Sequence, residues 1–568
     1  MKIIGISVNH ISSAALLING EITDAAAEER FTREKYTRDF PVHVIEYILE
    51  KNAITFDDID AIAIAWNPAI NLNMFRKSFS RHYRWMPEIL YAIPNQLMKM
   101  NKPEVHQYTL QRFSYNTNKQ LDIYYVNHHL CHSALTFYLS NFQNAAILSM
   151  DGFGEQVCTK WAKSNSNRIK TLQDQYFPHS LGSYYEAITE FLGFKPDGDE
   201  WKVMGMAAYG NPETYADKFE RLIRLYPDGK YELDLTYFNH FNFDHPRLYS
   251  PKLLELFGDH DVRGSSPQEK HFDFAAAAQK FFEIVLFHCL RHLHNITNEK
   301  NLCFTGGSAM NCLANGNIYK ETPFDNLFIP YAPDDSGNAM GSALYVYHDI
   351  LGNKYKEKRQ RTSFLGPEWN DDRIEKKLKK YNISYRKSKD LIDETASFIV
   401  SGYVVAWYQG KMEFGQRALG NRSILADPRR KDMKEIINNK IKYRESFRPF
   451  APAILKEKAD IYFDMPPEEN VAYMEKIFQI KDNMRNEIPA AVHADGTGRL
   501  QTVSENDNPL FYKLISAFEK KTGTPVLINT SFNIKGEPIV NTPEDAIKTF
   551  YTSGIDKLIL GSFIVEKE

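Results

Sequence analysis

Two short apolar runs in this chain each end in a glycine-containing turn, and this pairing limits the folds that the chain can adopt. Residues 145–150 lead into Asp151-Gly152-Phe153-Gly154, and residues 301–305 lead into Gly306-Gly307. Runs of this length predict buried strands, and glycines after a strand let backbone amides approach an anion. The second turn opens a helix, an arrangement that seats a phosphate or nucleotide at a helix N-terminus. Two units of strand, glycine turn and helix predict a duplicated α/β core, although no exact sequence repeat accompanies them.

The first residues of the chain fit the same core. Residues 1–8 read as a strand, residues 9–13 form a polar turn, and the apolar runs 14–18 and 21–25 flank Asn19-Gly20. Asn-Gly between two such runs predicts a β-hairpin. A strand, a polar turn and a returning hairpin resemble the beginning of the actin-like and hexokinase-like ATPase core, in which the first turn faces the ligand phosphates.

A histidine segment follows the strand expected at residues 122–126. His128 and His132 are four residues apart, so on a helix their imidazoles share one face and can bind one metal ion, with Asp151 as a hard oxygen ligand. Hydrogen-bonded histidines on a buried helix would give the same spacing. A further carboxylate is available in the acidic, glycine-containing turn at Asp334-Asp335, which completes a metal site in outline.

Composition places the chain in a broad class. Its 568 residues suggest two to four domains, and the formal charge of -3 does not indicate a nucleic-acid surface. Five cysteines without a CxxC pair favour reduced thiols. The N-terminal apolar run is too short for a signal peptide, and no run approaches the ~18 residues needed to span a bilayer. We expect a cytoplasmic protein without membrane association.

A polar charged run at residues 351–363 looks like a linker, and a basic unit follows it. Its densest part is residues 409–428, joined by a second basic stretch at residues 440–452. Arginine and lysine interleaved with glycine and proline predict a rigid phosphate pocket, whereas a solvated basic surface is the alternative. The strand expected at residues 524–533 ends in hydroxyl and amide groups, and Thr542-Pro543 predicts a helix cap.

Together these segments resemble the bacterial O-carbamoyltransferase family, which includes nodulation-factor and antibiotic carbamoyltransferases. The resemblance covers nearly the whole chain and rests on residues 128–134, 151–155, 202–210, 306–311, 413–424 and 529–533. It implies an N-terminal domain, residues 1–355, with the duplicated actin-like fold of metal-dependent threonylcarbamoyl-transfer proteins. It also implies a C-terminal domain, residues 356–568, with an α/β twisted sheet like that of the threonylcarbamoyl-AMP synthases.

The resemblance further implies a two-step reaction. Carbamoyl phosphate and ATP would give carbamoyl-adenylate in the C-terminal domain, and the N-terminal domain would pass the carbamoyl group to a hydroxyl of a small-molecule acceptor such as a natural product or sugar. Arginine and lysine side chains can neutralise phosphates there, and serine and asparagine can donate hydrogen bonds. The implied ion is iron, with Mg²⁺ or Mn²⁺ as alternatives, and it would act as a Lewis acid.

Carried over residue by residue, the metal ligands are His128, His132, Asp151 and Asp335, with His129 as an alternative ligand and Asp335 preferred over Asp334. The catalytic residues are His10, as a base on the acceptor hydroxyl, and Arg417, Lys442 and Arg444. The residues expected to bind substrate or nucleotide are Lys35, Lys202, Gly306, Gly307, Asn311, Arg422, Ser423, Arg448, Asn529 and Ser531. The chain departs from the family pattern at Ile11, Tyr36 and Trp201, all of them on the acceptor side.

Other functions fit parts of the sequence. An actin-like sugar kinase or ATPase with a regulatory domain explains the glycine turns but has no need of His128 and His132. A nucleotide-sensing protein would need only the basic pocket. Transfer of threonylcarbamoyl to tRNA shares both domains, but the balanced charge weighs against a nucleic-acid partner. A homodimer is compatible with the sequence.

Overall fold

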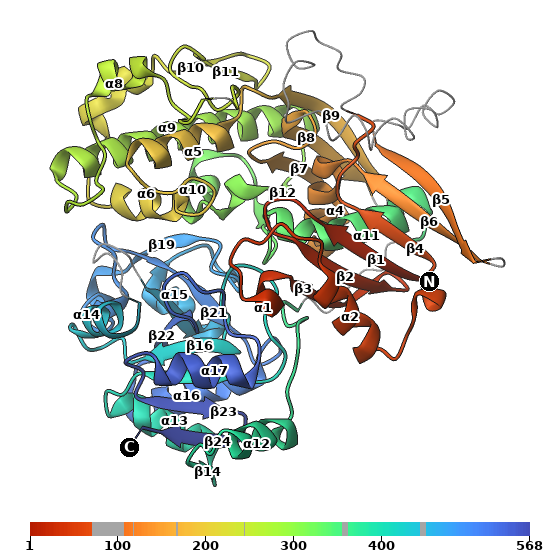
Figure 1. Cartoon of the computed structure of the whole chain (residues 1–568). Coiled ribbons are helices and arrows are strands. Elements are labelled where there is room, and N and C mark those ends of the chain that lie inside the picture. Colours follow the sequence, from red (N-terminus) through yellow and green to blue (C-terminus); the bar gives the residue numbers. More distant parts are fainter. Residues whose placement is uncertain are drawn as a thin grey trace. The chain divides into compact units, whose positions relative to one another are not determined.

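The structure is a computed structural model that describes residues 1–70, 107–116, 119–165, 168–243, 245–354, 362–442 and 450–567. It divides into two compact units, each of which is described by itself (Figure 1). The N-terminal unit contains Met1–Glu28 and Thr37–Gln360. The C-terminal unit contains Arg361–Glu568 together with the short segment Glu29–Tyr36. Nothing in the sequence indicates that these eight residues leave the unit that surrounds them in the chain.

The first sheet of the N-terminal unit has the strand order β3-β2-β1-β4-β6-β5. Strands β1, β2 and β3 are an antiparallel meander, β1, β4 and β6 run parallel, and β5 adds an antiparallel edge. The predicted hairpin is confirmed, because Asn19 and Gly20 join β2 to β3 with φ of 50° and 88°. The bounds are β1 (Lys2–Ser7), β2 (Ser13–Ile18), β3 (Glu21–Ala27), β4 (Ala61–Ile64), β5 (Tyr108–Asn116) and β6 (Lys119–Val126).

The second sheet repeats this plan. Read from its far edge, its order is β9-β8-β7-β12-β13, with β7, β8 and β9 antiparallel and β7, β12 and β13 parallel. The bounds are β7 (Asn144–Met150), β8 (Val157–Asn165), β9 (Arg168–Tyr176), β12 (Asn301–Thr305) and β13 (Asn326–Phe328). Strand β7 therefore corresponds to β1, and β13 corresponds to β6. The predicted duplicated actin-like core is confirmed by this topology.

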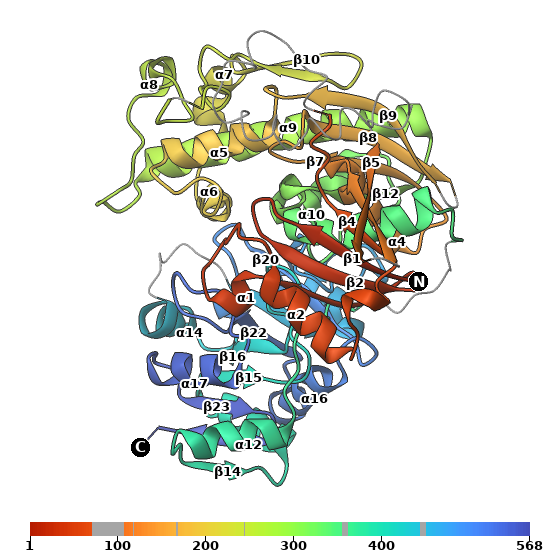
Figure 2. The ribbon, with the colours of Figure 1, turned by 45° about the vertical axis from the view of Figure 1, so that its right-hand side comes forward.

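Two helices pack between these sheets, and each follows the last parallel strand of one sheet but packs on the other (Figures 1 and 2). Helix α4 (His128–Ser140) follows β6 and packs on β7 and β12, whereas α11 (Asn338–Tyr345) follows β13 and packs on β1 and β2. The helices approach so closely that a Cβ at Gly341 of α11 would lie 2.1 Å from the carbonyl oxygen of Cys131 in α4. Because each helix packs on the sheet that it does not follow in the chain, the starts of α4 and α11 lie close to the ends of β1 and β7.

The rest of the N-terminal unit is largely helical. After β9 the chain forms a layer around the long helix α9 (Glu269–Thr297), which α5 and α6 contact (Figure 2). The remaining bounds are α2 (Val42–Lys51), α5 (Leu181–Phe191), α6 (Glu200–Ala207), α7 (Ala216–Phe219), β10 (Ile223–Leu225), β11 (Tyr231–Leu233), α8 (Pro251–Phe257) and α10 (Cys312–Glu321). No described helix combines the length and apolar character that a membrane crossing requires.

The C-terminal unit is built on a mixed sheet of order β14-β24-β23-β15-β16-β22-β17-β21, with a small sheet β18-β19-β20. Alternation along β15 separates two apolar layers: Ala406 and Tyr408 face one, and Val405 and Trp407 face the other. Helices α12, α14 and α17 supply the first layer, and α13 and α16 supply the second. The predicted α/β architecture of this unit is confirmed.

The elements of the C-terminal unit have the following bounds: α1 (Glu29–Thr32), α12 (Asp371–Lys380), β14 (Tyr385–Lys387), α13 (Leu391–Val400), β15 (Val405–Tyr408), β16 (Arg422–Ala426), α14 (Met433–Ile437), β17 (Ala451–Leu455), α15 (Ala459–Tyr462), β18 (Phe463–Asp464), β19 (Ile477–Ile480), β20 (Thr497–Arg499), β21 (Gln501–Val503), α16 (Pro509–Thr522), β22 (Val526–Ser531), α17 (Pro543–Tyr551), β23 (Lys557–Leu560) and β24 (Phe563–Glu566). The predicted cap of α17 is present, because the side chain of Thr542 accepts from the backbone N–H of Asp545.

Candidate functional site

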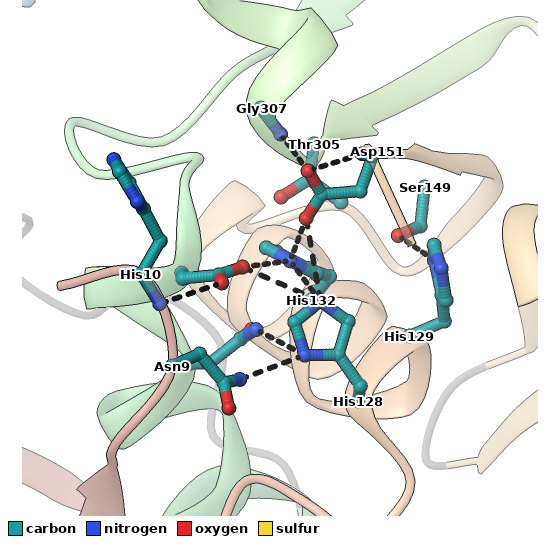
Figure 3. A network of polar contacts seen from close by, with 12 residues as sticks. Asn9, His10, His128, His129, His132, Ser149, Asp151, Thr305 and Gly307 are labelled. Carbon is teal, nitrogen blue, oxygen red and sulfur yellow. Dashed lines mark hydrogen bonds and ion pairs between the residues drawn. The ribbon is translucent and has the colours of Figure 1, made fainter. Parts of the chain in front are cut away.

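Two histidines and two aspartates meet in the N-terminal unit (Figure 3). Nε2 of His132 lies 3.1 Å from Nε2 of His128 and 2.9 Å from Oδ2 of Asp151. Oδ1 of Asp335 lies 3.3 Å from Nε2 of His128 and 3.4 Å from Nε2 of His132. Atoms that share a metal ion with bonds of about 2.1 Å lie about 3.0–3.4 Å apart. These four side chains therefore have the spacing of a coordination shell.

Each ligand comes from the end of a strand in the duplicated core. His128 and His132 lie on α4 after β6, and Asp335 lies in the turn between β13 and α11. Asp151 follows β7, the counterpart of β1. The ligands thus come from equivalent places in the two halves, because parallel strands bring their carboxyl ends to one edge of a sheet.

The electrostatics of the cluster suit a cation. Burial lowers the pKa of His132, but hydrogen bonds and charges from Asp151 and Asp335 outweigh it and raise the pKa to about 9. Burial raises the pKa of Asp151, yet the hydrogen bonds from His128 and His132 leave it well below its usual value. Oδ1 of Asp335 is buried and approaches Nε2 of His128 and His132 at 3.3 and 3.4 Å, but it makes no well-formed hydrogen bond with the described residues. A divalent ion between these atoms would give that oxygen a strong partner, so the residues present fit a metal.

Glycines next to the cluster hold the carboxylate of Asp151. Its Oδ1 accepts from the N–H of Gly152 at 2.8 Å and from the N–H of Gly307 at 3.2 Å. A Cβ at Gly306, which has a φ of 92°, would lie 2.1 Å from the carbonyl oxygen of Met150, and one at Gly307 would lie 2.9 Å from Oδ1 of Asp151. Only glycine fits at position 306, and the amide of Gly307 is directed at a predicted metal ligand.

Glu155, a buried carboxylate outside the predicted site residues, fixes the start of α4. Glu155 accepts from the backbone N–H groups of His128 and Asn67 and from the side-chain amide of Asn127. These bonds satisfy otherwise free N–H groups at the helix N-terminus and fix the backbone of the first histidine. The acidic residue after Asp151-Gly152-Phe153-Gly154 is the only sequence signal for this role, and it does not reveal the partner.

The alternative ligand His129 is directed away from the cluster. Its Nε2 donates to the carbonyl oxygen of Val157 at 2.7 Å, and its Nδ1 lies 2.8 Å from Oγ of Ser149 (Figure 3). A carbonyl oxygen only accepts, so Nε2 carries the proton and Nδ1 accepts from the serine hydroxyl. Burial and the neighbouring histidines lower the pKa of His129, so the ring stays neutral. The geometry favours His128 as the first ligand.

The orientation of His128 depends on an amide. Nδ1 of His128 lies 3.0 Å from Nδ2 of Asn9 and 3.5 Å from Nδ2 of Asn338. When Nε2 of a histidine binds a metal, Nδ1 carries the proton and needs an acceptor. A half-turn of the Asn9 side-chain amide places its oxygen there. Asn9 lies in the turn after β1, so a residue from the first sheet's opening strand helps to orient His128.

His10 contacts the cluster through its backbone. Its N–H lies 3.3 Å from Oδ2 of Asp335, and its ring is directed away from the ligands (Figure 3). Nη2 of Arg38 lies 3.3 Å from Nδ1 of His10 and 3.3 Å from Oδ2 of Asp197. Because a guanidinium only donates, Nδ1 of His10 accepts this bond.

Three further predicted binding residues already have protein partners. Nζ of Lys202 lies 3.0 Å from Oδ2 of Asp199, and Nζ of Lys35 lies over the ring of Tyr36. Asn311 exchanges two hydrogen bonds with Gln279. Its Oδ1 also caps α10. These contacts indicate a structural use for Asn311.

In the C-terminal unit, the loop of residues 413–421 is fixed from within. Oε1 of Glu413 accepts from the backbone N–H groups of Leu419, Asn421 and Arg422 at 2.7–3.1 Å. Arg422 is fully buried, donates to four backbone carbonyl oxygens and stacks 3.7 Å from the ring of Tyr408. The prediction that Arg422 binds nucleotide gains no support from these contacts, which give it a structural role.

Two other predicted residues also support this loop. Oγ of Ser423 accepts from the N–H of Gly420, and Nδ2 of Asn529 donates to the carbonyl oxygen of Ala418. In contrast, Arg417 is half-buried and makes no hydrogen bond or ion pair with the described residues. The backbone of the loop is therefore fixed by hydrogen bonds, and Arg417 is the predicted residue whose side chain remains available to bind a ligand.

Lys442 and Ser531 meet beside the end of this loop. Nζ of Lys442 donates to the carbonyl oxygen of Ser531 at 2.5 Å and to Oδ1 of Asn533 at 2.8 Å. The register pairs Ser423 with Ser531, so this cluster and the loop lie at the same edge of the sheet. Asn533 also belongs to this cluster, although it is not among the predicted site residues. Arg444 and Arg448 lie outside the described residues.

Comparisons with known proteins identify both parts of the chain. The family described as carbamoyltransferase N-terminus matches residues 2–344, and that described as carbamoyltransferase C-terminus matches residues 396–567. An uncharacterised protein of Synechocystis sp. is 36% identical over 100% of this chain and 96% of its own length. The nodulation protein NolNO of Sinorhizobium fredii is 35% identical, over 98% of this chain and 79% of its own length.

Likeness to solved structures is weaker. HypF of T. kodakarensis is 14% identical, covering 62% of this chain and 48% of its own, with a TM-score of 0.33. A ROK family glucokinase from Streptomyces griseus is 11% identical, covering 61% of this chain and 99% of its own, with a TM-score of 0.25. At these TM-scores nothing about function follows from either match.

Proposed function

Because the chain belongs to the carbamoyltransferase family, we propose that it is an O-carbamoyltransferase that consumes ATP and carbamoyl phosphate in two steps. The single observation that carries this proposal is the cluster of His128, His132, Asp151 and Asp335. ATP–Mg²⁺ sites of actin-like kinases do not require two histidines on one helix face, whereas transfer of an acyl-like group benefits from a Lewis acid. We propose iron as the ion.

The first step belongs to the C-terminal unit. Water cleaves carbamoyl phosphate into bound carbamate and phosphate, and a carbamate oxygen then attacks the α-phosphorus of ATP. Carbamoyl-adenylate forms and pyrophosphate leaves. Arg417 and Lys442 neutralise the phosphates, and Ser531 donates a hydrogen bond. The ammonium of Lys442 has three donors, so it can bind phosphate oxygens in place of part of its present carbonyl and amide partners.

The second step belongs to the N-terminal unit. The acceptor hydroxyl attacks the carbamoyl carbon, AMP leaves, and the hydroxyl proton passes to a base, for which we propose Nδ1 of His10. That nitrogen becomes available when Arg38 releases it. An ion held by His128, His132, Asp151 and Asp335 would supply Lewis-acid polarisation of the carbamoyl carbonyl. The acceptor is a hydroxylated small molecule, in keeping with the nodulation proteins among the relatives.

One assay separates this function from that of a kinase. The protein is incubated with ATP and carbamoyl phosphate, with and without candidate hydroxylated acceptors, and pyrophosphate, AMP and ADP are measured. We expect pyrophosphate without an acceptor and AMP with one. ADP in place of pyrophosphate would replace the proposal with a sugar kinase or ATPase.

A further inference from the structure

The segment Glu29–Tyr36 brings a buried arginine into the C-terminal unit. Arg30 is 4% exposed, and its Nη2 donates to the carbonyl oxygen of Gly415 at 2.9 Å. Its Nε lies 3.5 Å from Oε1 of Glu29. Its Nη1 is shielded from solvent and has no hydrogen-bond partner among the residues that the structure describes. One end of a buried guanidinium is therefore left without an acceptor from that part of the chain.

Such an arrangement is unfavourable unless something else supplies the acceptor. A buried charge must be compensated by partners, and an N–H group removed from water without one loses its hydrogen bond altogether. Glu29 offsets part of the charge of Arg30, but its Oε2 is used by the backbone N–H of Tyr36. The oxygens of a carboxylate or a phosphate group could accept the hydrogen bonds that Nη1 of Arg30 has to donate.

Arg33 in the same segment shows the contrast. Its Nη1 and Nη2 donate to the carbonyl oxygens of Ile539 and Pro538 at 2.7 and 2.8 Å, and its Nε lies 3.4 Å from Asp545. These bonds use the whole fork and fasten the segment to the C-terminal unit. Anchoring is thus already provided by Arg33, and the spare donor of Arg30 is not needed for it.

The carbonyl that Arg30 binds lies two residues before Arg417. Gly415 has a φ of 106°, a conformation that favours glycine, and it lies in the loop of residues 413–421, which Glu413 fixes from within. Arg417 makes no hydrogen bond or ion pair with the described residues. Arg30 therefore binds the backbone two residues before Arg417, and both side chains have donors that no described residue uses. The loop lies at the end of the sheet where Ser423 pairs with Ser531, next to Lys442.

We propose that Arg30 binds a phosphate group of a substrate in the C-terminal unit, through Nη1 and together with Arg417. The inference rests on the proposed adenylate-forming function of that unit. The shared chemistry is a phosphate dianion, and its source is either carbamoyl phosphate or ATP. The N-terminal part of the chain thereby supplies one ligand to a substrate that the C-terminal unit otherwise holds.

The test is calorimetric binding to the full chain of two probes, ATP and phosphonoacetamide, an analogue of carbamoyl phosphate that resists hydrolysis. We expect Arg30→Met to raise the Kd of one probe at least tenfold and leave the other unchanged, and the affected probe names the source. Arg30→Lys keeps the charge but loses the fork, so it recovers only part of the affinity. The control Arg33→Met lowers the unfolding temperature without changing either Kd.

Unchanged Kd values for both probes in Arg30→Met would overturn the inference. Should Arg30→Met not fold, Arg30→Lys decides in its place, with at least a threefold rise expected and an unchanged Kd overturning the proposal. Failure of the proposed function appears separately, as a wild-type protein that releases no pyrophosphate from ATP and carbamoyl phosphate. The binding measurements still judge Arg30 in that case.

Discussion

The metal cluster and the basic loop were both predicted from residue type, but the structure uses their side chains differently. In the cluster, four predicted ligands direct their polar atoms toward one point, and an oxygen of Asp335 is left for an ion. In the loop, the donors of Arg422, Ser423 and Asn529 satisfy the protein's own backbone. Spacing on a helix fixes where a side chain goes, whereas a guanidinium in a loop fits carbonyl oxygens as well as phosphates.

The largest expected effect is at the cluster. His132→Ala removes a ligand that lies within 3.4 Å of the three others, so metal binding and carbamoyl transfer should fall together, the transfer by about 10³-fold or more. Metal content and transfer from added carbamoyl-adenylate are the measurements. Pyrophosphate release should persist, and its loss would mean that the two steps do not occupy separate units. Asp334→Asn, next to Asp335, is the control that keeps the metal.

The next largest effects are expected in the loop of residues 413–421 and at Arg422 beside it, where loss of Arg417 should reduce activity and loss of Arg422 should reduce stability. Arg417→Ala should slow pyrophosphate release by about 10²-fold with little change in stability, since its donors serve no group among the described residues. Arg422→Ala should lower the free energy of unfolding by about 3 kcal/mol or more, because it orphans four buried carbonyl oxygens. Urea unfolding and a pyrophosphate assay of both variants test this. A stable, inactive Arg422→Ala protein would restore Arg422 to the phosphate site.

Metal affinity should depend on pH in a direction set by His132. Its pKa of about 9 means that the ring carries a proton at neutral pH in the absence of metal, and a bound metal needs the neutral ring. The apparent affinity should therefore fall about tenfold for each pH unit below that value, with one proton released per ion bound near pH 7. Calorimetry in buffers of different ionisation enthalpy counts that proton. Affinity independent of pH between 6 and 8 would contradict it.

The smallest effect is expected at His129, where a substitution should reduce stability but not metal binding. His129→Gln removes two buried hydrogen bonds, to Val157 and Ser149, and should cost about 1–3 kcal/mol of stability. Metal content should stay that of the wild type. Thermal unfolding and metal analysis of the purified variant provide the check, and a metal-free but stable protein would make His129 the ligand.

The sequence predicted what local spacing determines. The Asn19-Gly20 hairpin, the strand that runs into His128 and the turn after residue 150 all follow from patterns within ten residues. The partners of Glu155 lie on distant segments of the chain, and those of Glu413 lie in its own irregular loop, whose backbone no periodic pattern specifies, so neither role was visible. The placement of Arg30 depends on a segment that leaves its own unit, and no local pattern encodes that.

The duplicated topology of the N-terminal unit has a consequence for its metal. The predicted ligands come from equivalent strand ends in both halves, so the coordination of an ion bound there would depend on the distance between the two halves. Bonds of about 2.1 Å tolerate changes of only a few tenths of an ångström. Any hinge motion between the sheets, such as one driven by an acceptor, would then appear as a change in coordination number. The colour or magnetism of the ion would report it without a label.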